Sequence, residues 1–150
     1  AQAAEAPEGL QAFTTDSMNE IKAQFDGEPF LMSLWSIDCA PCIVDLERLN
    51  ELKAEYPSLP VVLVATDPLG DSEPVLNMLA DYGLQDVQNW IFADDFTERL
   101  RYSIDPQWRG ELPRSYLFNA EHQPRAHSGV LSEALLERLI ELHRAQLANL

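Results

Sequence analysis

The sequence predicts one domain of the α/β class, with a central sheet flanked by helices. Two short apolar runs, 30–35 and 61–66, are typical of strands that are buried on both faces. Between them, apolar residues recur at helical spacing from residue 41 to residue 56. A strand, a helix and a second strand in this order indicate a βαβ unit, whose parallel strands are joined by a right-handed crossover.

The rest of the chain continues this alternation of helices and strands. Thr14, Thr15 and Asp16 form a capping signal before a first helix that Gly27 ends. Further elements are expected as helices over 72–82, 97–104 and from a cap at Ser132, and as strands over 89–93, 115–119 and 124–128. We expect residues 1–12 to form a flexible lead segment and residues 13–150 to form the domain.

The composition excludes some classes of partner. The chain has 150 residues, enough for one domain with a substantial core. Lysine and arginine number 10 against 25 acidic residues, so the net charge of −15 argues against nucleic acid or an anionic membrane as the main partner. No apolar run reaches the roughly 18–20 residues of a spanning helix. We therefore expect no membrane span, and a start that is either flexible or the stub of a removed secretory signal.

Both cysteines lie in one motif, "WSIDCAPC", which runs from Trp35 to Cys42. A structural zinc site needs four ligands, and the sequence has no second cysteine pair and no paired histidines. A structural disulfide across two intervening residues would stabilise the fold little. A redox pair fits the strand-to-helix junction, because the helix N-terminus favours a thiolate at Cys39. Cys39 is then the exposed nucleophile, and Cys42, one turn later, is the resolving thiol.

This motif resembles that of the thioredoxin superfamily, in which a tryptophan precedes Cys-x-Pro-Cys at the head of a helix. The matching residues are Trp35, Cys39, Pro41 and Cys42. Leu112 and Pro113, just before the strand at 115–119, resemble the cis-proline loop of the same family. The layout is most similar to the TlpA/ResA-like branch of extracytoplasmic thiol–disulfide oxidoreductases.

The resemblance implies a three-layer α/β/α thioredoxin-like fold with a mixed central sheet. It also implies an enzyme that reduces disulfides of extracytoplasmic proteins, as in cytochrome c maturation or the reduction of copper-site cysteines. The Cys39–Cys42 disulfide would need no further cofactor. The implied partners are a disulfide-containing protein and a membrane thiol reductase that donates electrons. We expect a monomer in the periplasm or another extracytoplasmic space, with a cleaved signal or a membrane anchor in the full-length protein.

The resemblance also implies which residues bind the substrate. The backbone of Leu112, beside Pro113, would offer hydrogen bonds to the substrate chain. Trp35 is expected beneath the motif, as core or as the wall of a pocket. Trp108 either lines the substrate groove or caps the open end of the core. The remaining expected contacts are the neighbours of the cysteines, namely Asp38, Ala40 and Pro41.

Three residues depart from the family pattern or leave alternatives open. Ser33 stands where thioredoxin itself has a buried aspartate. Asp45, three residues after the second cysteine, is either a proton shuttle for Cys42 or a solvent-facing helix charge. Asp38 replaces the usual aromatic neighbour of Cys39. It is either a helix N-cap or solvated turn residue, or a charge that raises the pKa of Cys39.

Two other functions remain as alternatives to the oxidoreductase. A reduced cysteine pair is a soft ligand set for Cu(I), so the protein could act as a copper chaperone. The nearby residues support this weakly, because Met32 lies inside a strand and Met18 and Met78 are far away in sequence. A peroxiredoxin-type peroxidase ranks last, because its motif before a lone peroxidatic cysteine is absent from the sequence.

Overall fold

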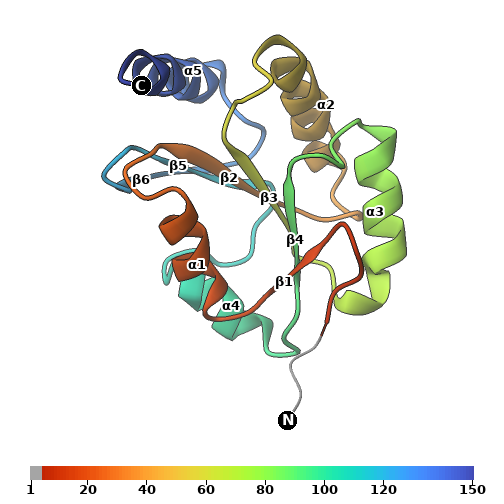
Figure 1. Ribbon diagram of the computed structural model, residues 1–150. Coiled ribbons are helices and arrows are strands. Elements are labelled where there is room, and N and C mark those ends of the chain that lie inside the picture. Colours follow the sequence, from red (N-terminus) through yellow and green to blue (C-terminus); the bar gives the residue numbers. More distant parts are fainter. Residues whose placement is uncertain (1–4) are drawn as a thin grey trace.

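The computed structural model describes residues 5–150 and shows a three-layer α/β/α fold (Figure 1). The elements of this part of the chain are β1 (Gln11–Phe13), α1 (Ser17–Gln24), β2 (Phe30–Trp35), α2 (Ala40–Glu55), β3 (Val61–Ala65), the 3₁₀ helix η1 (Leu69–Asp71), α3 (Ser72–Asp81), β4 (Gln88–Phe92), α4 (Thr97–Ile104), β5 (Arg114–Phe118), β6 (Pro124–Ser128) and α5 (Glu133–Ala148). The fold class is therefore the one that the sequence predicted.

The strands form one mixed sheet in the order β1-β4-β3-β2-β5-β6. The pairs β1–β4, β4–β3 and β3–β2 are parallel, whereas the pairs β2–β5 and β5–β6 are antiparallel. Trp35 of β2 pairs with Ala65 of β3, and Leu34 pairs with Arg114 of β5. Extending the second register by one residue brings Pro113 opposite Trp35. The cysteine motif and the proline loop thus lie at the same edge of the sheet.

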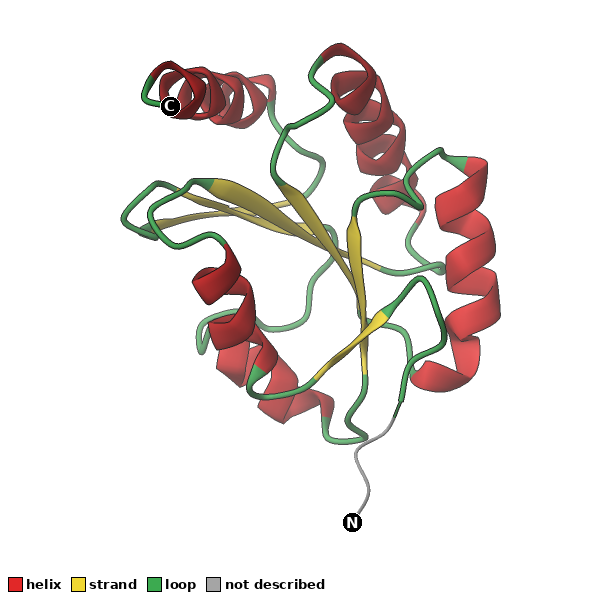
Figure 2. Cartoon of the chain, in the orientation of Figure 1, coloured by secondary structure: helices red, strands yellow, loops and turns green. Residues whose placement is uncertain are grey.

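Helices cover both faces of the sheet and bury a core on each side. α2, α3 and α5 lie on one face, and α1 and α4 lie on the other (Figures 1 and 2). Leu46 of α2 and Leu135 of α5 belong to the first core, whereas Ile21 of α1 and Leu100 of α4 belong to the second. The buried strands supply side chains to both cores, as their continuous apolar runs predicted.

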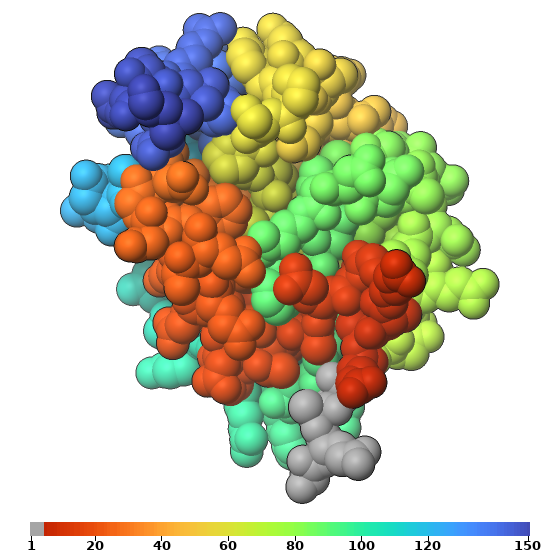
Figure 3. Space-filling view, in the orientation of Figure 1, coloured from red at the N-terminus to blue at the C-terminus, as the bar shows by residue number. Residues whose placement is uncertain are grey.

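The C-terminal helix closes the first layer. In the space-filling view, the end of α5 lies against the segment after α1 and the segment after α2 (Figure 3). A hydrogen bond joins His143 Nε2 of α5 to Ser58 Oγ, at 3.1 Å. Burial lowers the pKa of His143, so this ring is neutral near pH 7.

The domain begins earlier than the expected boundary at residue 13. Leu10 is buried and β1 starts at Gln11, because this strand pairs with β4 at the edge of the sheet. The first part of the expected lead segment, residues 1–4, lies outside the described residues. At the other edge, β6 begins at Pro124 and is mostly exposed. None of the helices within residues 5–150 combines the length and apolar character needed to cross a membrane.

Candidate active site

The two cysteines form a disulfide at the junction of β2 and α2. Their Cα atoms are 5.3 Å apart, a separation that a disulfide spans. Cys42 is fully buried, whereas Cys39 is partly exposed. Cys39 is the N-cap of α2, and its Sγ accepts a hydrogen bond from the backbone N–H of Cys42 at 3.3 Å. The more exposed sulfur therefore lies at a helix N-terminus, which favours a thiolate after reduction.

Asp38, Ala40 and Pro41 are exposed around Cys39. The interpretation of Asp38 as the N-cap is wrong, because α2 begins at Ala40 and leaves the cap position to Cys39. The backbone N–H of Asp38 instead donates to Ser36 Oγ at 3.2 Å, in the turn before the helix. Asp38 is thus a solvated turn residue, and its effect on the Cys39 thiolate stays a prediction.

Asp45 is buried one turn beyond Cys42, so it is not a solvent-facing helix charge. Its Oδ1 accepts a hydrogen bond from the backbone N–H of Leu131 at 2.8 Å. Its Oδ2 is also buried and has no hydrogen-bond partner within the described part of the chain. Burial raises the pKa of Asp45 to about 6, against the lowering effects of the Leu131 N–H and of His127. The site therefore holds a carboxyl group that titrates near neutral pH.

Ser33, in β2, stands where thioredoxin itself has a buried aspartate, and it is paired here with another serine. Its Oγ lies 3.1 Å from the Oγ of Ser115, directly across the β2–β5 ladder. Both side chains are buried, and each hydroxyl satisfies the other. This position supplies no titratable group, so any buried acid near the cysteines comes from another position.

A second buried carboxyl group, which the sequence interpretation missed, belongs to Asp67. It follows β3 directly, and its Oδ2 accepts a hydrogen bond from Ser36 Oγ at 2.9 Å. The backbone N–H of Ile37 also points to this carboxylate, at 3.3 Å from Oδ1. Burial raises the pKa of Asp67, although these hydrogen bonds oppose the rise. Asp67 thus fixes the turn before Cys39. Its place after a parallel strand next to β2 was the available signal.

The Leu112–Pro113 peptide bond is cis and lies just before β5. Pro113 is buried, and Leu112 is half-buried against both cores. The carbonyl oxygen of Pro113 accepts a hydrogen bond from the backbone N–H of Gly129 at 2.9 Å. Cys39 packs against the same core as Leu112, which places the proline loop and the disulfide around one core.

The residues Gly129, Val130 and Leu131, here called the 129–131 loop, connect the proline loop to the cysteine helix. Gly129 bonds to Pro113, and Leu131 bonds to Asp45. Val130 between them is 42% exposed. The sequence interpretation missed this loop, although a glycine before the Ser132 cap signals a turn.

The two tryptophans that were expected near the substrate, Trp35 and Trp108, are buried core residues and not exposed substrate contacts. Trp35 is 2% exposed and belongs to the core beneath α2. Trp108 is 4% exposed and belongs to the core on the opposite face of the sheet. Its Nε1 donates to the carbonyl oxygen of Glu111 at 2.9 Å, so it supports the loop from inside. Both indoles are therefore almost fully covered by the rest of the protein.

Within residues 5–150, no group of three or more histidine, cysteine, aspartate or glutamate side chains is arranged to hold a metal ion. The chemistry that the arrangement itself offers is that of the disulfide, with a titrating carboxyl group one turn away.

No protein-family model matches the sequence, and no curated protein is similar enough to count as a match. Solved structures do resemble the chain. One is a secreted Mycobacterium tuberculosis disulfide oxidoreductase homologous to E. coli DsbE, with 19% identity, a TM-score of 0.63, and coverage of 79% of this chain and 84% of that one. Another is a thiol:disulfide interchange protein of the thioredoxin family from Chlorobium tepidum, with 18% identity, a TM-score of 0.62, and coverage of 94% and 96%.

A third similar structure is a DsbF homologue from Corynebacterium diphtheriae, with 18% identity and a TM-score of 0.61. The similarity covers 80% of this chain and 74% of that one. These comparisons show that the chain has a thioredoxin-like fold. The resemblance that the cysteine motif and the proline loop predicted is thereby confirmed at the level of the fold.

Proposed function

We propose that this protein is a thiol–disulfide oxidoreductase that reduces disulfides of extracytoplasmic partner proteins. One observation carries the proposal. A partly exposed Cys39, at a helix N-terminus, is paired with a buried Cys42 in a disulfide. An exposed sulfur can react with a partner, while the buried sulfur is reached only from within the protein. This asymmetry suits exchange with another protein better than it suits a structural bridge.

The reaction begins from the reduced protein. The Cys39 thiolate attacks one sulfur of the partner disulfide, which forms a mixed disulfide and releases the other partner sulfur as a thiolate that takes up a proton. The Cys42 thiol loses its proton and attacks Cys39 Sγ. The Cys39–Cys42 bond forms again, and the partner leaves with both sulfurs reduced. The partner has then gained two electrons and two protons.

Asp45 is the proposed proton acceptor for Cys42. It lies one turn beyond Cys42 on α2, and its buried Oδ2 has no hydrogen-bond partner within residues 5–150. With a pKa of about 6, the carboxyl group is mostly ionised at pH 7 and can take a proton from the thiol. Burial keeps this proton away from bulk water during the exchange.

The proposed substrate seat combines the proline loop with the exposed residues around Cys39. The backbone of Leu112 is the proposed hydrogen-bonding partner of the substrate chain, beside Pro113. The surface next to it consists of Asp38, Ala40, Pro41 and Val130. Trp35 and Trp108 support this surface from the two cores rather than touch the substrate.

The electrons are proposed to come from a membrane thiol reductase, which returns the disulfide to the dithiol state. An extracytoplasmic location is proposed with it, supported by the similarity to a secreted disulfide oxidoreductase. Such a dithiol/disulfide cycle needs no bound cofactor. The proposed reducing direction rests on the family resemblance and not on the cysteine motif, because reduction potentials across such folds run from about −270 to about −120 mV.

The decisive experiment measures the reduction potential of the Cys39–Cys42 pair together with reduction of insulin by the wild-type protein. We expect a potential near the reducing end of that range, with insulin reduction that Cys39→Ser abolishes. Cys42→Ser should instead trap a mixed disulfide with the substrate. Glu47→Gln, at an exposed position of the same helix, is a matched control that should leave both results unchanged.

Two results would contradict the proposal. A potential near −120 mV without insulin reduction would point to disulfide donation instead. Tight, stoichiometric Cu(I) binding that Cys39→Ser abolishes, in a protein that does not reduce insulin, would favour the copper chaperone.

A further inference from the structure

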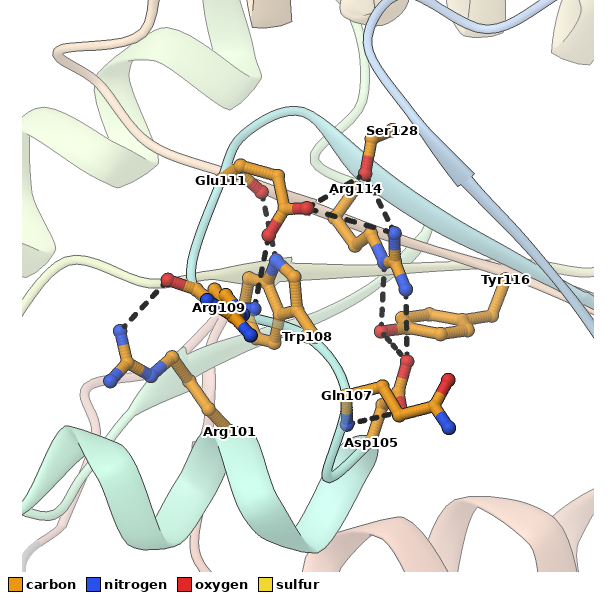
Figure 4. A network of polar contacts seen from close by, with 9 residues as sticks. All are labelled: Arg101, Asp105, Gln107, Trp108, Arg109, Glu111, Arg114, Tyr116 and Ser128. Atoms are coloured by element: carbon orange, nitrogen blue, oxygen red, sulfur yellow. Dashed lines mark hydrogen bonds and ion pairs between the residues drawn. The ribbon is translucent and has the colours of Figure 1, made fainter.

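A single guanidinium group connects the two loops that adjoin Pro113. Arg114 Nη2 donates to Asp105 Oδ2 at 2.9 Å, and Arg114 Nη1 donates to Ser128 Oγ at 2.6 Å (Figure 4). Asp105 follows α4 and begins the segment 105–112, here called the 105–112 loop, which leads to the proline. Ser128 ends β6, directly before the 129–131 loop. One arm of the guanidinium therefore reaches the 105–112 loop, and the other reaches the last residue of β6, which pairs with Arg114 across the ladder and directly precedes the 129–131 loop.

Other polar groups fasten the same two loops. Tyr116 OH accepts a hydrogen bond from Arg114 Nε at 3.0 Å and donates to Asp105 Oδ2 at 2.9 Å. Ser128 Oγ donates to Glu111 Oε2 at 3.2 Å, near the end of the 105–112 loop (Figure 4). The 105–112 loop is therefore held at both ends. Arg114 lies at the centre of this network, because it bonds directly to Asp105, Tyr116 and Ser128.

The ion pair in this network is well shielded from water. The Arg114 side chain is 13% exposed, and the Asp105 side chain is 18% exposed. Burial alone would raise the pKa of Asp105, but the hydrogen bonds that its carboxylate accepts hold the pKa below its usual value. The planar fork of an arginine can serve two partners in fixed directions, whereas a lysine offers only a point charge.

We propose that Arg114 is a positioning residue, which sets the spacing of the 105–112 and 129–131 loops and thereby the substrate seat beside Cys39. The 129–131 loop bonds to Pro113 on one side and to Asp45 on the other. An error in loop spacing would therefore displace the Leu112–Pro113 backbone relative to the cysteine helix. This inference rests on the proposed function, because it concerns how the substrate chain is held.

The test is Arg114→Lys, assayed by reduction of insulin. We expect KM to rise about tenfold while kcat changes less than about twofold, because the substrate seat is disturbed and the cysteines are not. The reduction potential should stay at the wild-type value. Tyr116→Phe removes one hydroxyl and leaves the ion pair, so its KM should rise only about two- to threefold. If Arg114→Lys does not fold, Tyr116→Phe can still test the positioning role.

Amide hydrogen exchange measures how firmly the two loops are held, and it needs no activity assay. In Arg114→Lys, the amides of Gln107 and Gly129 should exchange at least about tenfold faster, while core amides of β2 keep their rates. Arg48→Lys is the control, because Arg48, in the middle of α2, also bonds two carboxylates, those of Glu51 and Glu133, but neither belongs to the 105–112 loop or to the 129–131 loop. It should change neither KM nor the exchange of these two amides.

The outcomes separate the two proposals. An unchanged KM in a folded Arg114→Lys, or loop amides that keep their exchange rates, would overturn the positioning role. A KM rise that comes with a shifted reduction potential would overturn it too, since the cysteines themselves would then be disturbed. A wild-type protein that does not reduce insulin would refute the proposed function, and hydrogen exchange would still decide whether Arg114 holds the loops.

Discussion

Two carboxylates on opposite faces of the sheet, the buried Asp45 and the partly buried Asp105, have very different hydrogen-bond partners. Asp45 accepts one hydrogen bond and leaves its second oxygen without a partner in the described chain. Asp105 accepts hydrogen bonds from a backbone N–H, a hydroxyl and a guanidinium. The pKa of Asp45 rises to about 6, whereas that of Asp105 stays below its usual value.

The difference separates a group suited to proton transfer from a group suited to holding structure. A buried acid with few partners titrates close to neutral pH, where it can exchange protons with a thiol. An acid with every oxygen engaged keeps its charge over the whole physiological range and binds its partners continuously. The depth of burial and the charge of the partners act together, since Asp67, whose two oxygens accept hydrogen bonds from neutral donors only, still has a raised pKa, whereas Asp105 has a guanidinium partner and a lowered pKa.

The largest expected effect comes from Asp45→Asn, which keeps the shape of the side chain and removes its ability to accept a proton. We expect insulin reduction at pH 7 to slow roughly a hundredfold, since general base catalysis typically contributes 10²–10⁴. The loss should shrink as the pH rises, because Cys42 then ionises without help. Steady-state kinetics from pH 6 to pH 9 measure this, and an equal loss at every pH would rule out the proton role.

The next effect concerns how stability depends on pH. The folded protein binds the proton of Asp45 more tightly than the unfolded chain does, so ionisation of this group destabilises the fold. A rise of the pKa from 3.8 to about 6 corresponds to about 2–3 kcal/mol, present in full at low pH and lost as the pH rises through 6. Urea unfolding of wild type and Asp45→Asn at pH 4 and pH 7 measures it.

In that comparison, the wild-type protein should lose stability relative to Asp45→Asn as the pH rises from 4 to 7. Taking the difference between the two proteins removes the contribution of other titrating groups. A constant difference across this range would mean that Asp45 titrates normally in the folded protein.

At pH 7, Asp105→Asn should destabilise the fold, whereas Asp45→Asn removes a charge that itself destabilises the fold. Asp105→Asn removes the charge that compensates Arg114, so the free energy of unfolding should fall by about 2 kcal/mol, less than for a fully buried pair. The loss should disappear only when acid protonates the wild-type Asp105, below its usual pKa. Glu141→Gln, which breaks an exposed ion pair with Arg138, should cost almost nothing. Equal losses of unfolding free energy in Asp105→Asn and Glu141→Gln would show that the shielded ion pair stabilises the fold no more than the exposed one does.

The smallest expected effect belongs to Asp38→Asn, which tests an exposed charge instead of a buried one. Removing a negative charge next to Cys39 should lower the pKa of the reduced Cys39 thiol by less than about one, because water and salt screen the interaction. The pH dependence of alkylation by iodoacetamide measures this pKa. No change would leave Asp38 as a plain turn residue, while a large drop would mean that it strongly disfavours the thiolate.

Much of the fold follows from local patterns in the sequence. The run that forms β2 ends where the sequence predicted, at Trp35, and α4 spans the predicted Thr97–Ile104. Strand β1 escaped prediction because three residues show no period, and only its pairing with β4 makes it a strand. The interpretation that made Asp38 the N-cap of α2 was wrong by one residue. The side chain that accepts a hydrogen bond from a free N–H of the first turn is that of Cys39.

The site could be predicted only where its residues are close in sequence. The cysteine motif located Cys39 and Cys42, and helical spacing placed Asp45 one turn further on. Asp67 could not be found this way, because its partner Ser36 lies 31 residues earlier in the chain. The partners of Arg114 are closer in sequence, but they lie in loops and strand ends that no periodic pattern brings together. The sequence left Trp108 either in the substrate groove or at the open end of the core, and only the second core shows where its ring lies.

The two outer strands of the sheet limit what a bound chain can do. β1 is only three residues long, and β6 starts with a proline and exposes Arg125 next to it. Short edges with proline and charged side chains discourage another strand from adding to the sheet. Under the proposed function the protein must release each partner, and a long, flat edge would hold an extended chain by backbone pairing. The short β1 and the charged β6 would then leave the sulfur exchange and the proline loop as the main contacts with a partner, and the bond between the sulfurs breaks when the reaction ends.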